Sequence, residues 1–380
     1  MRHILAGARL FDGAAFRDDH ALVIADGRIE AILPAAKAGP PSQQVSGIIA
    51  PGFLDLQVNG GGGVMVDGAI DAAALRHICA THRRLGCAGI LPTLITDTAP
   101  ATARVIATGI EAARAGVPGF LGLHLEGPHL DPRRKGAHDP ALIRPMTDED
   151  LARLCEAAQA LPVLMVTLAP ENATPEQIAA LSGAGALVSL GHSDCDFETA
   201  QAAFRAGASC ATHLFNAMSQ LGHRAPGLVG AVLAGGASAG LIADAIHAHP
   251  AAMRAALSAR AEGVFLVTDC MAFAGTDQTE MMLHGRTVLR RDGRLTLPDG
   301  TLAGADLRMD RAVATLVGKV GIAPERALSM ATLQPARTLG LQDRYGRLAP
   351  GCDADLILLD ETLALRAVWQ DDGWQSPLPG

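Results

Sequence analysis

The sequence is short of aromatic residues, paired cysteines and long apolar runs. Aromatic residues make up only 3% of the 380 residues, a scarcity to which we attach no function. No apolar run reaches the roughly 18 residues that a membrane-spanning helix needs. The N-terminal segment MRHILAGARLFDG has one short apolar patch followed by polar residues, which is unlike a secretory signal. We therefore expect no membrane partner.

The cysteines form no recognisable framework. There are seven, no two of them form a CxxC pair, and most have apolar neighbours. An odd number of scattered cysteines fits a reducing compartment better than a set of disulfides. We therefore predict a cytoplasmic protein.

Charge of one sign is not concentrated anywhere. No block of five like charges occurs, and the formal net charge is -8 with a pI near 5.9. An acidic chain without a basic patch is a poor partner for nucleic acid, so we expect none. The densest basic run, 133–135, is interpreted either as a solvated loop or as a loop over an anionic substrate.

What the sequence does contain is a regular alternation of strand-like and helix-like segments. Between residues 51 and 342, eight apolar runs alternate with Ala-rich stretches of helical period. This alternation indicates βαβ units with a parallel sheet, and eight units match a (β/α)8 TIM-like barrel in size. The predicted strands are 53–59, 88–96, 120–127, 162–170, 186–193, 210–217, 239–248 and 264–270.

The two ends of the chain have a different sequence pattern. Residues 1–50 and 343–380 carry short Val, Ile and Leu runs separated by Asp-Gly and Pro-Gly turn signals. Neither segment is long enough to fold alone. We therefore predict an α/β protein in which both termini build one small β-sandwich domain (1–50 plus 343–380) beside the barrel domain (51–342).

Polar residues fall at the ends of the predicted strands. In a (β/α)8 barrel the carboxyl ends of the strands surround the active site. Histidines scattered through a core would not be placed so regularly. The residues that end the eight runs are Gln57 with Asn59, Thr96, Glu126, Thr167, His192, His213, His247 and Asp269.

Three of these residues suit a catalytic metal. Glu126, His192 and His213 supply one carboxylate and two imidazoles, a ligand set for zinc or a similar ion with a position left for water. Such a metal lowers the pKa of its water toward about 7. Asp269 suits a proton shuttle from that water to a leaving amine. His124 shares a strand face with Glu126, but Glu126 lies nearer the strand's carboxyl end and is the preferred ligand.

Each of these residues also has a purely structural interpretation. A buried histidine at a strand end is often only a hydrogen-bonded core residue. Glu126 could cap the turn before Gly-Pro, and Asp269 could cap the next helix. Their joint occurrence at strand ends favours the metal site. The glycine run 60–63 could cradle an anion or simply form the turn after the first strand.

A series of motifs carries a family resemblance. They are PGFLDLQVNGGGG (51–63), LPTLIT (91–96), LGLHLEGPHL (121–130), KGAH (135–138), GHS (191–193), ATHLFNAM (211–218), IADAIH (242–247), LVTD (266–269), LAGADL (302–307) and GRLAPGCDADLILLD (346–360). The chain resembles, essentially end to end, the N-acetylglucosamine-6-phosphate deacetylases of the amidohydrolase superfamily. HLEGP, GHS and THLFNAM in this order are highly specific for that family.

The resemblance implies a reaction and a set of roles. N-acetyl-D-glucosamine 6-phosphate and water would give D-glucosamine 6-phosphate and acetate, in amino-sugar catabolism. Glu126, His192 and His213 would be the metal ligands, with Asp269 as general acid/base. The implied substrate contacts are His138 and His247 on the sugar and the acetyl carbonyl, Arg224 with the backbone of Asn216 and Ala217 on the phosphate, and Ala137, Asp244, Leu302, Ala303 and Gly304 around the sugar. Without the resemblance, Arg224 would serve equally well as a solvated loop residue.

One departure from the superfamily pattern concerns the metal. Many amidohydrolases carry His-x-His at the end of the first strand, where this chain has Gln57-Val58-Asn59. Amides are poor zinc ligands compared with imidazoles. We therefore predict one divalent metal ion per chain, zinc first, with iron, cobalt or manganese as alternatives.

Other functions remain open at this point. The substrate could be N-acetylgalactosamine 6-phosphate, because PGLVG (226–230) and Arg224 argue for a phosphosugar but do not decide the configuration at C4. The chain could also be another amidohydrolase, such as a cyclic-amide hydrolase or a deaminase, or a non-catalytic barrel scaffold. A scaffold is disfavoured because all four metal and acid/base positions are filled. The resemblance also suggests a homodimer.

Overall fold

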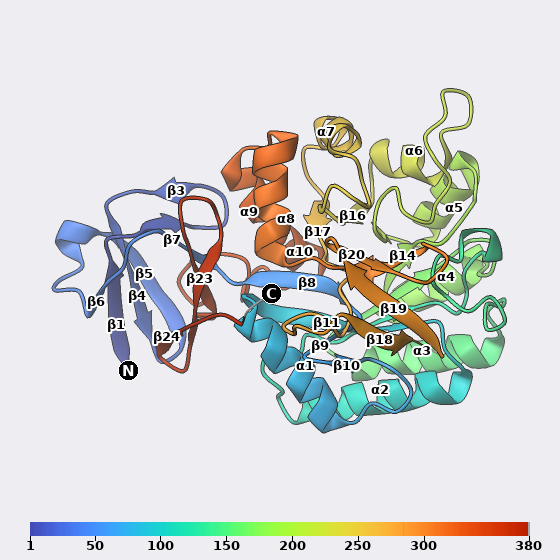
Figure 1. The fold of residues 1–380 in the computed structure, drawn as a ribbon, viewed down its shortest axis with the longest axis horizontal. Coiled ribbons are helices and arrows are strands. Elements are labelled where there is room, and N and C mark those ends of the chain that lie inside the picture. The colour runs from blue at the N-terminus through green and yellow to red at the C-terminus, as the bar shows by residue number, and fades with distance from the viewer. Residues whose placement is uncertain (284, 379–380) are drawn as a thin grey trace.

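The computed structural model describes residues 1–283 and 285–378. A barrel with surrounding helices forms most of the molecule, and a small β domain lies to one side (Figure 1). Each barrel strand pairs in parallel with its neighbour along the chain. This confirms the predicted (β/α)8 barrel, with one strand for each predicted run. The strands are β8 (Phe53–Val58), β11 (Cys87–Ile95), β12 (Leu123–Glu126), β13 (Leu164–Leu168), β14 (Leu187–Leu190), β15 (Cys210–Ala211), β16 (Ser238–Leu241) and β17 (Val264–Leu266).

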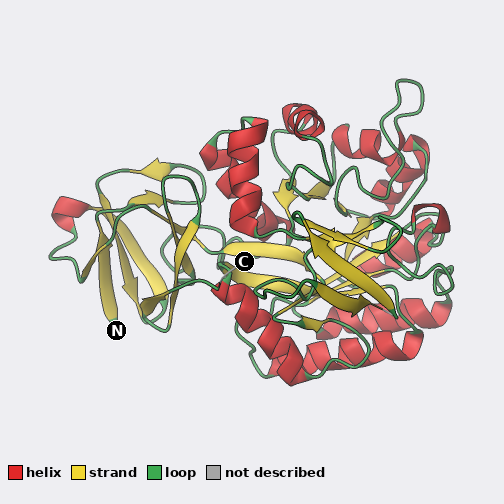
Figure 2. Cartoon of the chain, in the orientation of Figure 1, coloured by secondary structure: helices red, strands yellow, loops and turns green. Residues whose placement is uncertain are grey.

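Helices cover the outside of the barrel (Figure 2). Several begin at side-chain caps: Thr147 accepts from the backbone N–H of Asp150, and Thr174 accepts from that of Gln177. Among the described residues, none of the helices has the length and apolar character that a membrane crossing needs. The helices are α1 (Ala72–Arg84), α2 (Ala99–Arg114), α3 (Asp148–Ala160), α4 (Pro175–Gly183), α5 (Phe197–Ala206), α6 (Gly227–Leu233), α7 (Pro250–Ala259), α8 (Met309–Thr315), α9 (Pro324–Ala331) and α10 (Leu333–Thr338), with single turns at η1 (Ala35–Lys37), η2 (Pro132–Arg134) and η3 (Leu316–Val320).

Several barrel strands are shorter than the runs that predicted them. The run 210–217 gives a strand of two residues, and 239–248 gives a strand that ends at Leu241. The backbone leaves the strand because residues just beyond it have positive φ, 48° at His192, 31° at His213 and 51° at Asp269. A left-handed residue turns the chain, so these side chains stand at the rim of the barrel.

The segment after β17 closes the barrel against β8. Val58 and Cys270 form a parallel bridge. The backbone N–H of Asp269 donates to the carbonyl of Gln57 over 3.0 Å, and that of Asn59 donates to the carbonyl of Cys270 over 2.9 Å. The first and last strands of the barrel are therefore joined at the end where the predicted site residues lie.

Both termini contribute to the small β domain, as predicted. One sheet has the order β5-β4-β1-β6. The other has the order β24-β23-β22-β7-β2-β3, in which three strands from the C-terminal end lie beside three from the N-terminal end and β22 pairs with β7. Leu5, Leu22 and Ile24 pack against Ile49 and Trp369 between the two sheets, which makes a sandwich. The strands are β1 (Arg2–Ala6), β2 (Arg9–Phe11), β3 (Phe16–Arg17), β4 (His20–Ala25), β5 (Arg28–Pro34), β6 (Gln43–Gln44), β7 (Ile48–Pro51), β22 (Leu356–Leu359), β23 (Leu365–Gln370) and β24 (Gly373–Gln375). The domain boundaries at 50/51 and 342/343 stay a prediction.

A further sheet was not predicted. Four antiparallel strands follow the barrel strands in the sequence and lie over the barrel mouth (Figure 1). Met271 and Phe273, just beyond β17, join Leu283, Val288 and Leu295 in a small apolar core beneath this sheet. The strands are β18 (Glu280–Leu283), β19 (Arg286–Arg291), β20 (Arg294–Thr296) and β21 (Leu302–Ala305).

Candidate active site and metal centre

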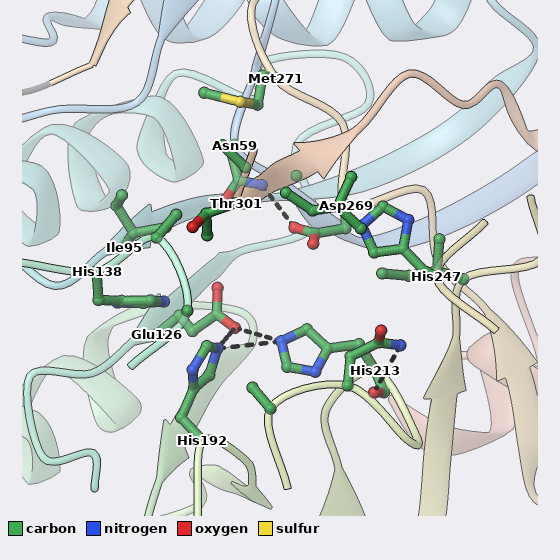
Figure 3. Close-up of a pocket in the computed structure, with 18 of the residues that line it drawn as sticks. Asn59, Ile95, Glu126, His138, His192, His213, His247, Asp269, Met271 and Thr301 are labelled. Atoms are coloured by element: carbon green, nitrogen blue, oxygen red, sulfur yellow. Dashed lines mark hydrogen bonds and ion pairs between the residues drawn. The ribbon is translucent and has the colours of Figure 1, made fainter. Parts of the chain in front are cut away.

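A cavity of about 310 Å³ lies at the carboxyl ends of the barrel strands (Figure 3). Its wall is formed by loops that follow the barrel strands and by β21. Twelve of the fourteen predicted site residues lie on this wall: Glu126, Ala137, His138, His192, His213, Asn216, Ala217, His247, Asp269, Leu302, Ala303 and Gly304.

Glu126, His192 and His213 bring three possible metal donors together. Oε1 of Glu126 lies 3.2 Å from Nε2 of His192 and 3.1 Å from Nε2 of His213, and the two Nε2 atoms are 3.1 Å apart. Donors about 2.0–2.1 Å from a tetrahedral zinc lie roughly 3.3 Å from one another. All three residues are buried, and their spacing fits a divalent ion that they could hold.

The histidine rings are oriented as a metal site requires. Nδ1–H of His192 donates to the carbonyl of Arg134 over 2.7 Å, which leaves Nε2 with its lone pair. Nδ1 of His213 is buried and has no hydrogen-bond partner among the described residues. Two Nε2 atoms that face each other at 3.1 Å cannot both carry a proton. The group therefore fits two neutral imidazole ligands better than two imidazolium ions paired with Glu126.

Glu126 is the charged member of the group. Burial alone would raise the pKa of Glu126, but the neighbouring imidazoles of His192 and His213 outweigh burial and lower that pKa well below its usual value. Gln57 adds a hydrogen bond from Nε2 to Oε1 over 3.1 Å. The carboxylate is therefore ionised at neutral pH, as a metal ligand must be.

Asp269 is held from three directions. Its backbone N–H donates to Gln57 O over 3.0 Å, its carbonyl accepts from the N–H of Ala305 over 2.8 Å, and its Oδ1 accepts from Nδ2 of Asn59 over 2.7 Å (Figure 3). Burial, followed by the charge of Glu126, raises the pKa of Asp269 to about 6. A fixed carboxyl that titrates near neutrality can both take up and release a proton.

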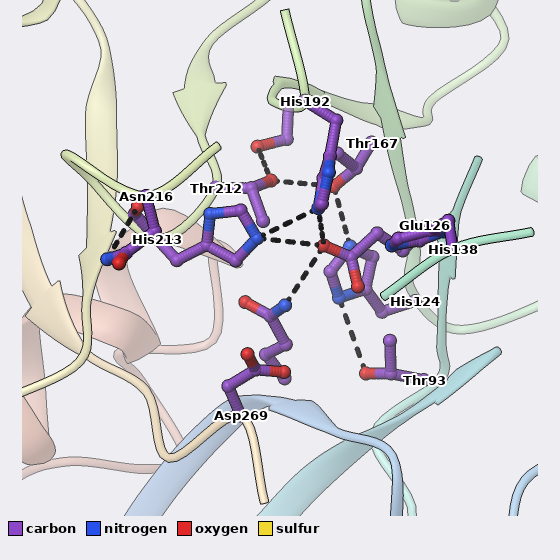
Figure 4. A network of polar contacts seen from close by, with 12 residues as sticks. Thr93, His124, Glu126, His138, Thr167, His192, Thr212, His213, Asn216 and Asp269 are labelled. Carbon is purple, nitrogen blue, oxygen red and sulfur yellow. Dashed lines mark hydrogen bonds and ion pairs between the residues drawn. The ribbon is translucent and has the colours of Figure 1, made fainter. Parts of the chain in front are cut away.

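A row of hydrogen-bonded side chains lies beside the three donors (Figure 4). Nδ1 of His124 is 3.3 Å from the hydroxyl of Thr93, and Nε2 is 2.7 Å from the hydroxyl of Thr167, which is 2.6 Å from that of Thr212. Burial lowers the pKa of His124 to about 4, so the ring is neutral. Both ring nitrogens of His124 thus face threonines, and Glu126 is the member of the HLE segment that joins the donor group.

His138 and His247 line the cavity, each held through Nδ1. The backbone N–H of Thr96 donates to Nδ1 of His138 over 3.3 Å, and the Thr96 hydroxyl lies 2.7 Å from the same atom. Nδ1–H of His247 donates to Oδ2 of Asp244 over 2.6 Å, while Oδ1 accepts the backbone N–H groups of Ile246 and His247, each over 2.8 Å. Asp244 was expected beside the sugar, but it lies behind His247 and fixes that ring.

Arg224 is the predicted residue that lies farthest from expectation. Its side chain is exposed on the loop between β15 and α6, outside the cavity wall. Asn216 and Ala217, the other predicted phosphate contacts, do lie on the wall, and Ala217 has a left-handed φ of 48°. The structure thus brings two of the three predicted phosphate contacts to the cavity.

Other residues of the wall were not among the predicted site residues, although Asn59 was expected at a strand end. They are mainly apolar and come from several separate segments, so no single sequence pattern marks them as a group. Two of them lie close in sequence to a predicted strand-end residue: Ile95 precedes Thr96, and Met271 follows Asp269 by two positions. These additional residues are Asn59, Met65, Ile95, Arg134, Gly136, Ile242, Met271, Leu283 and Thr301.

The structure also decides between the alternatives left open above. Residues 60–63 form a turn, because β9 (Gly60–Gly61) pairs with β10 (Val64–Met65) around two glycines of positive φ. The basic run 133–135 combines both interpretations, because Arg133 is 62% exposed while Arg134 lines the cavity, and both pair with Asp194 at 3.2 and 2.6 Å. Within the described chain, no helix starts at Asp269, so it is not a helix cap.

Known proteins with similar sequences agree with this geometry. The model of the amidohydrolase family matches residues 48–375. The chain is 38% identical to an N-acetylgalactosamine-6-phosphate deacetylase of Shewanella sp., over 96% of this chain and 94% of that one. It is 34% identical to an N-acetylglucosamine-6-phosphate deacetylase of Haemophilus influenzae, over 94% and 95%.

Solved structures agree as well. An N-acetylglucosamine-6-phosphate deacetylase from Pasteurella multocida superposes with a TM-score of 0.94 at 32% identity, covering 99% of this chain and all of that one. A mutant N-acetyl-D-glucosamine-6-phosphate deacetylase from Mycobacterium smegmatis, in complex with N-acetyl-D-glucosamine-6-phosphate, gives 0.91 at 30% identity, covering 98% and 99%. By its sequence and by the arrangement of its barrel, this chain belongs to the amidohydrolase family.

Proposed function

We propose that this protein hydrolyses the acetamide of N-acetyl-D-glucosamine 6-phosphate to D-glucosamine 6-phosphate and acetate. The observation that carries the proposal is the shared cavity wall on which Glu126, His192, His213 and Asp269 meet from four different strand ends. The relatives named above act, by their names, on amino-sugar 6-phosphates. The non-catalytic scaffold is disfavoured because the donor group and the acid/base are both complete.

Asp269 would carry out the proton transfers. Because the pKa of Asp269 is raised to about 6, the carboxyl is largely ionised at neutral pH yet protonates readily, so it can accept a proton from water and deliver it to the leaving amine. Its hydrogen bond with Asn59 fixes the rotation of the carboxyl group. The same residue therefore acts first as a base and then as an acid.

His138 and His247 would bind and polarise the substrate. The backbone N–H of Thr96 donates to Nδ1 of His138, so the proton of a neutral His138 is on Nε2 and can be donated to a carbonyl oxygen. His247 is held by Asp244 through Nδ1, which leaves Nε2 for a sugar hydroxyl. The apolar wall, which includes Ile95 and Met271, suits the methyl group of the acetyl substituent.

The metal in this proposal is one divalent ion per chain, zinc first. Glu126, His192 and His213 would hold it, and when bound it would polarise the amide carbonyl and lower the pKa of water. Iron, cobalt and manganese suit the same donors. Elemental analysis of purified protein should find close to one equivalent per chain; two equivalents, both needed for activity, would contradict the proposal.

The phosphate would bind at the backbone of Asn216 and Ala217, with Arg224 as its cationic contact. Arg224 is exposed outside the cavity wall, so this part of the proposal is linked to a homodimer in which the loop meets a second copy. Leu221, three residues earlier, is a large apolar residue that is 58% exposed in the single chain. Its exposure supports a dimer in which a second copy covers this loop. Light scattering of the wild type tests the dimer. A raised KM in Arg224→Ala would support the phosphate contact, and an unchanged KM would contradict it.

The cytoplasm is the proposed location. All seven cysteines are free, and six of them are buried. Free thiols of this kind persist in a reducing compartment.

N-acetylgalactosamine 6-phosphate is the second candidate substrate. The relative from Shewanella sp. carries that name at 38% identity, and one from Escherichia coli O157:H7 does so at 37%. The two sugars differ only in the configuration of one hydroxyl group, so the chemistry at the metal and Asp269 is the same for both.

One assay tests the whole proposal. Acetate release is measured from the 6-phosphates of N-acetylglucosamine and N-acetylgalactosamine and from unphosphorylated N-acetylglucosamine, with metal supplied. A higher kcat/KM for the galacto compound would move the assignment to the second candidate. Equal turnover of the unphosphorylated sugar would refute the phosphate contacts, and no acetate from any compound would refute the deacetylase.

A further inference from the structure

Two carboxamide side chains stand side by side at the end of β8. Gln57 and Asn59 are two residues apart, so their side chains point to the same face, toward the barrel interior and mouth. Nε2 of Gln57 donates to Oε1 of Glu126 over 3.1 Å. Nδ2 of Asn59 donates to Oδ1 of Asp269 over 2.7 Å, a contact drawn in Figure 3. Each amide thus serves a different carboxylate of the site.

The amide of Asn59 is kept in an unfavourable place. The residue is 4% exposed, and its Oδ1 is buried without a hydrogen-bond partner among the described residues. A buried acceptor without a partner costs stability, and a leucine of similar size would avoid that cost. The position therefore has a use that an apolar residue could not supply, and the contact with Asp269 is the one the structure offers.

Electrostatics explains why donors are needed there. Glu126 and Asp269 are two buried carboxylates whose charges repel, and this repulsion contributes to the raised pKa of Asp269. The hydrogen bond from Asn59 acts in the opposite direction. An N–H donor at each carboxylate offsets the repulsion without adding a net charge to a dry site.

We propose that Gln57 and Asn59 are a pair of positioning residues, which orient Glu126 and Asp269 and hold both carboxylates in place without a second cation. Gln57 acts through Glu126 on retention of the metal, and Asn59 acts through Asp269 on proton transfer. This inference rests on the deacetylase function proposed above, and the two residues give different experimental signatures.

Asn59 should affect the chemical step. In Asn59→Leu, kcat should fall roughly 10- to 100-fold, the rate equivalent of a hydrogen bond to an ionised group. KM and metal content should change much less than kcat, because the side-chain hydrogen bond of Asn59 goes to Asp269 and not to a metal donor. Asn59→Asp keeps the shape of the side chain and serves if the leucine variant does not fold.

The pH profile of Asn59→Asp separates positioning from a loss of stability. The charged and titratable groups that act on Asp269 are Glu126, His213 and His247 around the cavity, and Asp55 on β8. Replacing the donor by a second carboxyl beside Asp269 should move the acid limb of kcat/KM to higher pH. The matched control is Asn172→Asp, since Nδ2 of Asn172 donates to the carbonyl of Leu130 instead of a carboxylate; that limb should stay where it is in the wild type.

Gln57 should affect the metal. In Gln57→Met, metal content after dialysis against a limiting chelator should fall, and kcat should recover when excess metal is added. Three results would overturn the role of Asn59. They are a wild-type kcat in Asn59→Leu, an acid limb of kcat/KM that does not move in Asn59→Asp, and an equal movement of that limb in Asn172→Asp. Full metal retention in Gln57→Met would overturn that of Gln57. A wild type that releases no acetate would instead refute the proposed function, and the metal measurement on Gln57→Met would remain valid.

Discussion

Replacing Asp55 by asparagine should flatten the pH dependence of stability. Asp55 lies on the interior face of β8 and is fully buried. Its carboxylate accepts from the hydroxyl and the backbone N–H of Thr268 and from the backbone N–H of Gln57. Burial outweighs these hydrogen bonds and raises the pKa of Asp55 from 3.8 to about 7.

The sign of the effect follows from these two pKa values. Below about pH 4 the carboxyl is protonated in both the folded and the unfolded chain, so it does not lower the free energy of unfolding. Between pH 4 and 7 it is protonated in the folded chain but ionised in the unfolded chain, so a rise in pH favours unfolding. The shift of about 3 units amounts to roughly 4 kcal/mol above pH 7, of which about 2 kcal/mol is lost between pH 5.5 and 8.

The assay is urea unfolding of wild type and Asp55→Asn at pH 5.5 and pH 8, with saturating metal. The new amide keeps an acceptor for the two N–H donors and can donate to the hydroxyl of Thr268, so it should fold. Other titrating groups, including the metal ligands, are common to both proteins and cancel in the difference. The wild type should lose about 2 kcal/mol more than the variant over this interval. An identical loss in both proteins would show that Asp55 is ionised in the native state throughout, and the reasoning would be wrong.

Three further changes have defined outcomes. Asp269→Asn should reduce kcat by about 10²- to 10⁴-fold, the usual contribution of an acid/base group, with metal content unchanged; retained turnover would remove its assigned role. His213→Ala should abolish metal binding measured by elemental analysis, since only two donors remain, and metal at wild-type stoichiometry would exclude His213 as a ligand. Gly304→Ala should lower both Tm and kcat, because a Cβ there would lie 2.7 Å from the carbonyl oxygen of Asp269 at a φ of 63°. The control is Gly300→Ala, which has a φ of 86° but nothing within 4 Å, and which should lower Tm slightly and leave kcat alone.

The barrel was readable from the sequence because its signals are local and repeated. Each apolar run from 53–59 to 264–270 contains a strand, and the polar residue at its end lies at the rim, because strand direction is the same throughout a parallel sheet. The sequence alone could therefore predict one shared site for Glu126, His192 and His213, without any knowledge of distances. The pairing of both termini in one β domain could be predicted because both carry short apolar runs separated by turn signals, and neither is long enough to fold alone.

What could not be predicted depends on contacts between distant segments. The sheet β18–β21 lies over the barrel mouth through a small apolar core, and nothing in its own residues indicates that location. The family resemblance implied that Arg224 contacts the phosphate, but its side chain is exposed outside the cavity wall. Asp244 looked like a sugar contact by its place in IADAIH, whereas its carboxylate is used entirely within the segment, on His247 and two backbone N–H groups.

The charges around the cavity give an independent reason to expect a single metal ion. Glu126 and Asp269 supply two negative charges when ionised, while His192 and His213 are neutral in the ligand state. One divalent cation balances this set, whereas a second would leave two uncompensated positive charges in a buried site, which is costly. Among the described residues, Glu126, His192 and His213 are the one group of histidine, cysteine and carboxylate donors close enough to share an ion. A second ion would have to displace the amide donors that now satisfy the two carboxylates, and it would find poor ligands in their place.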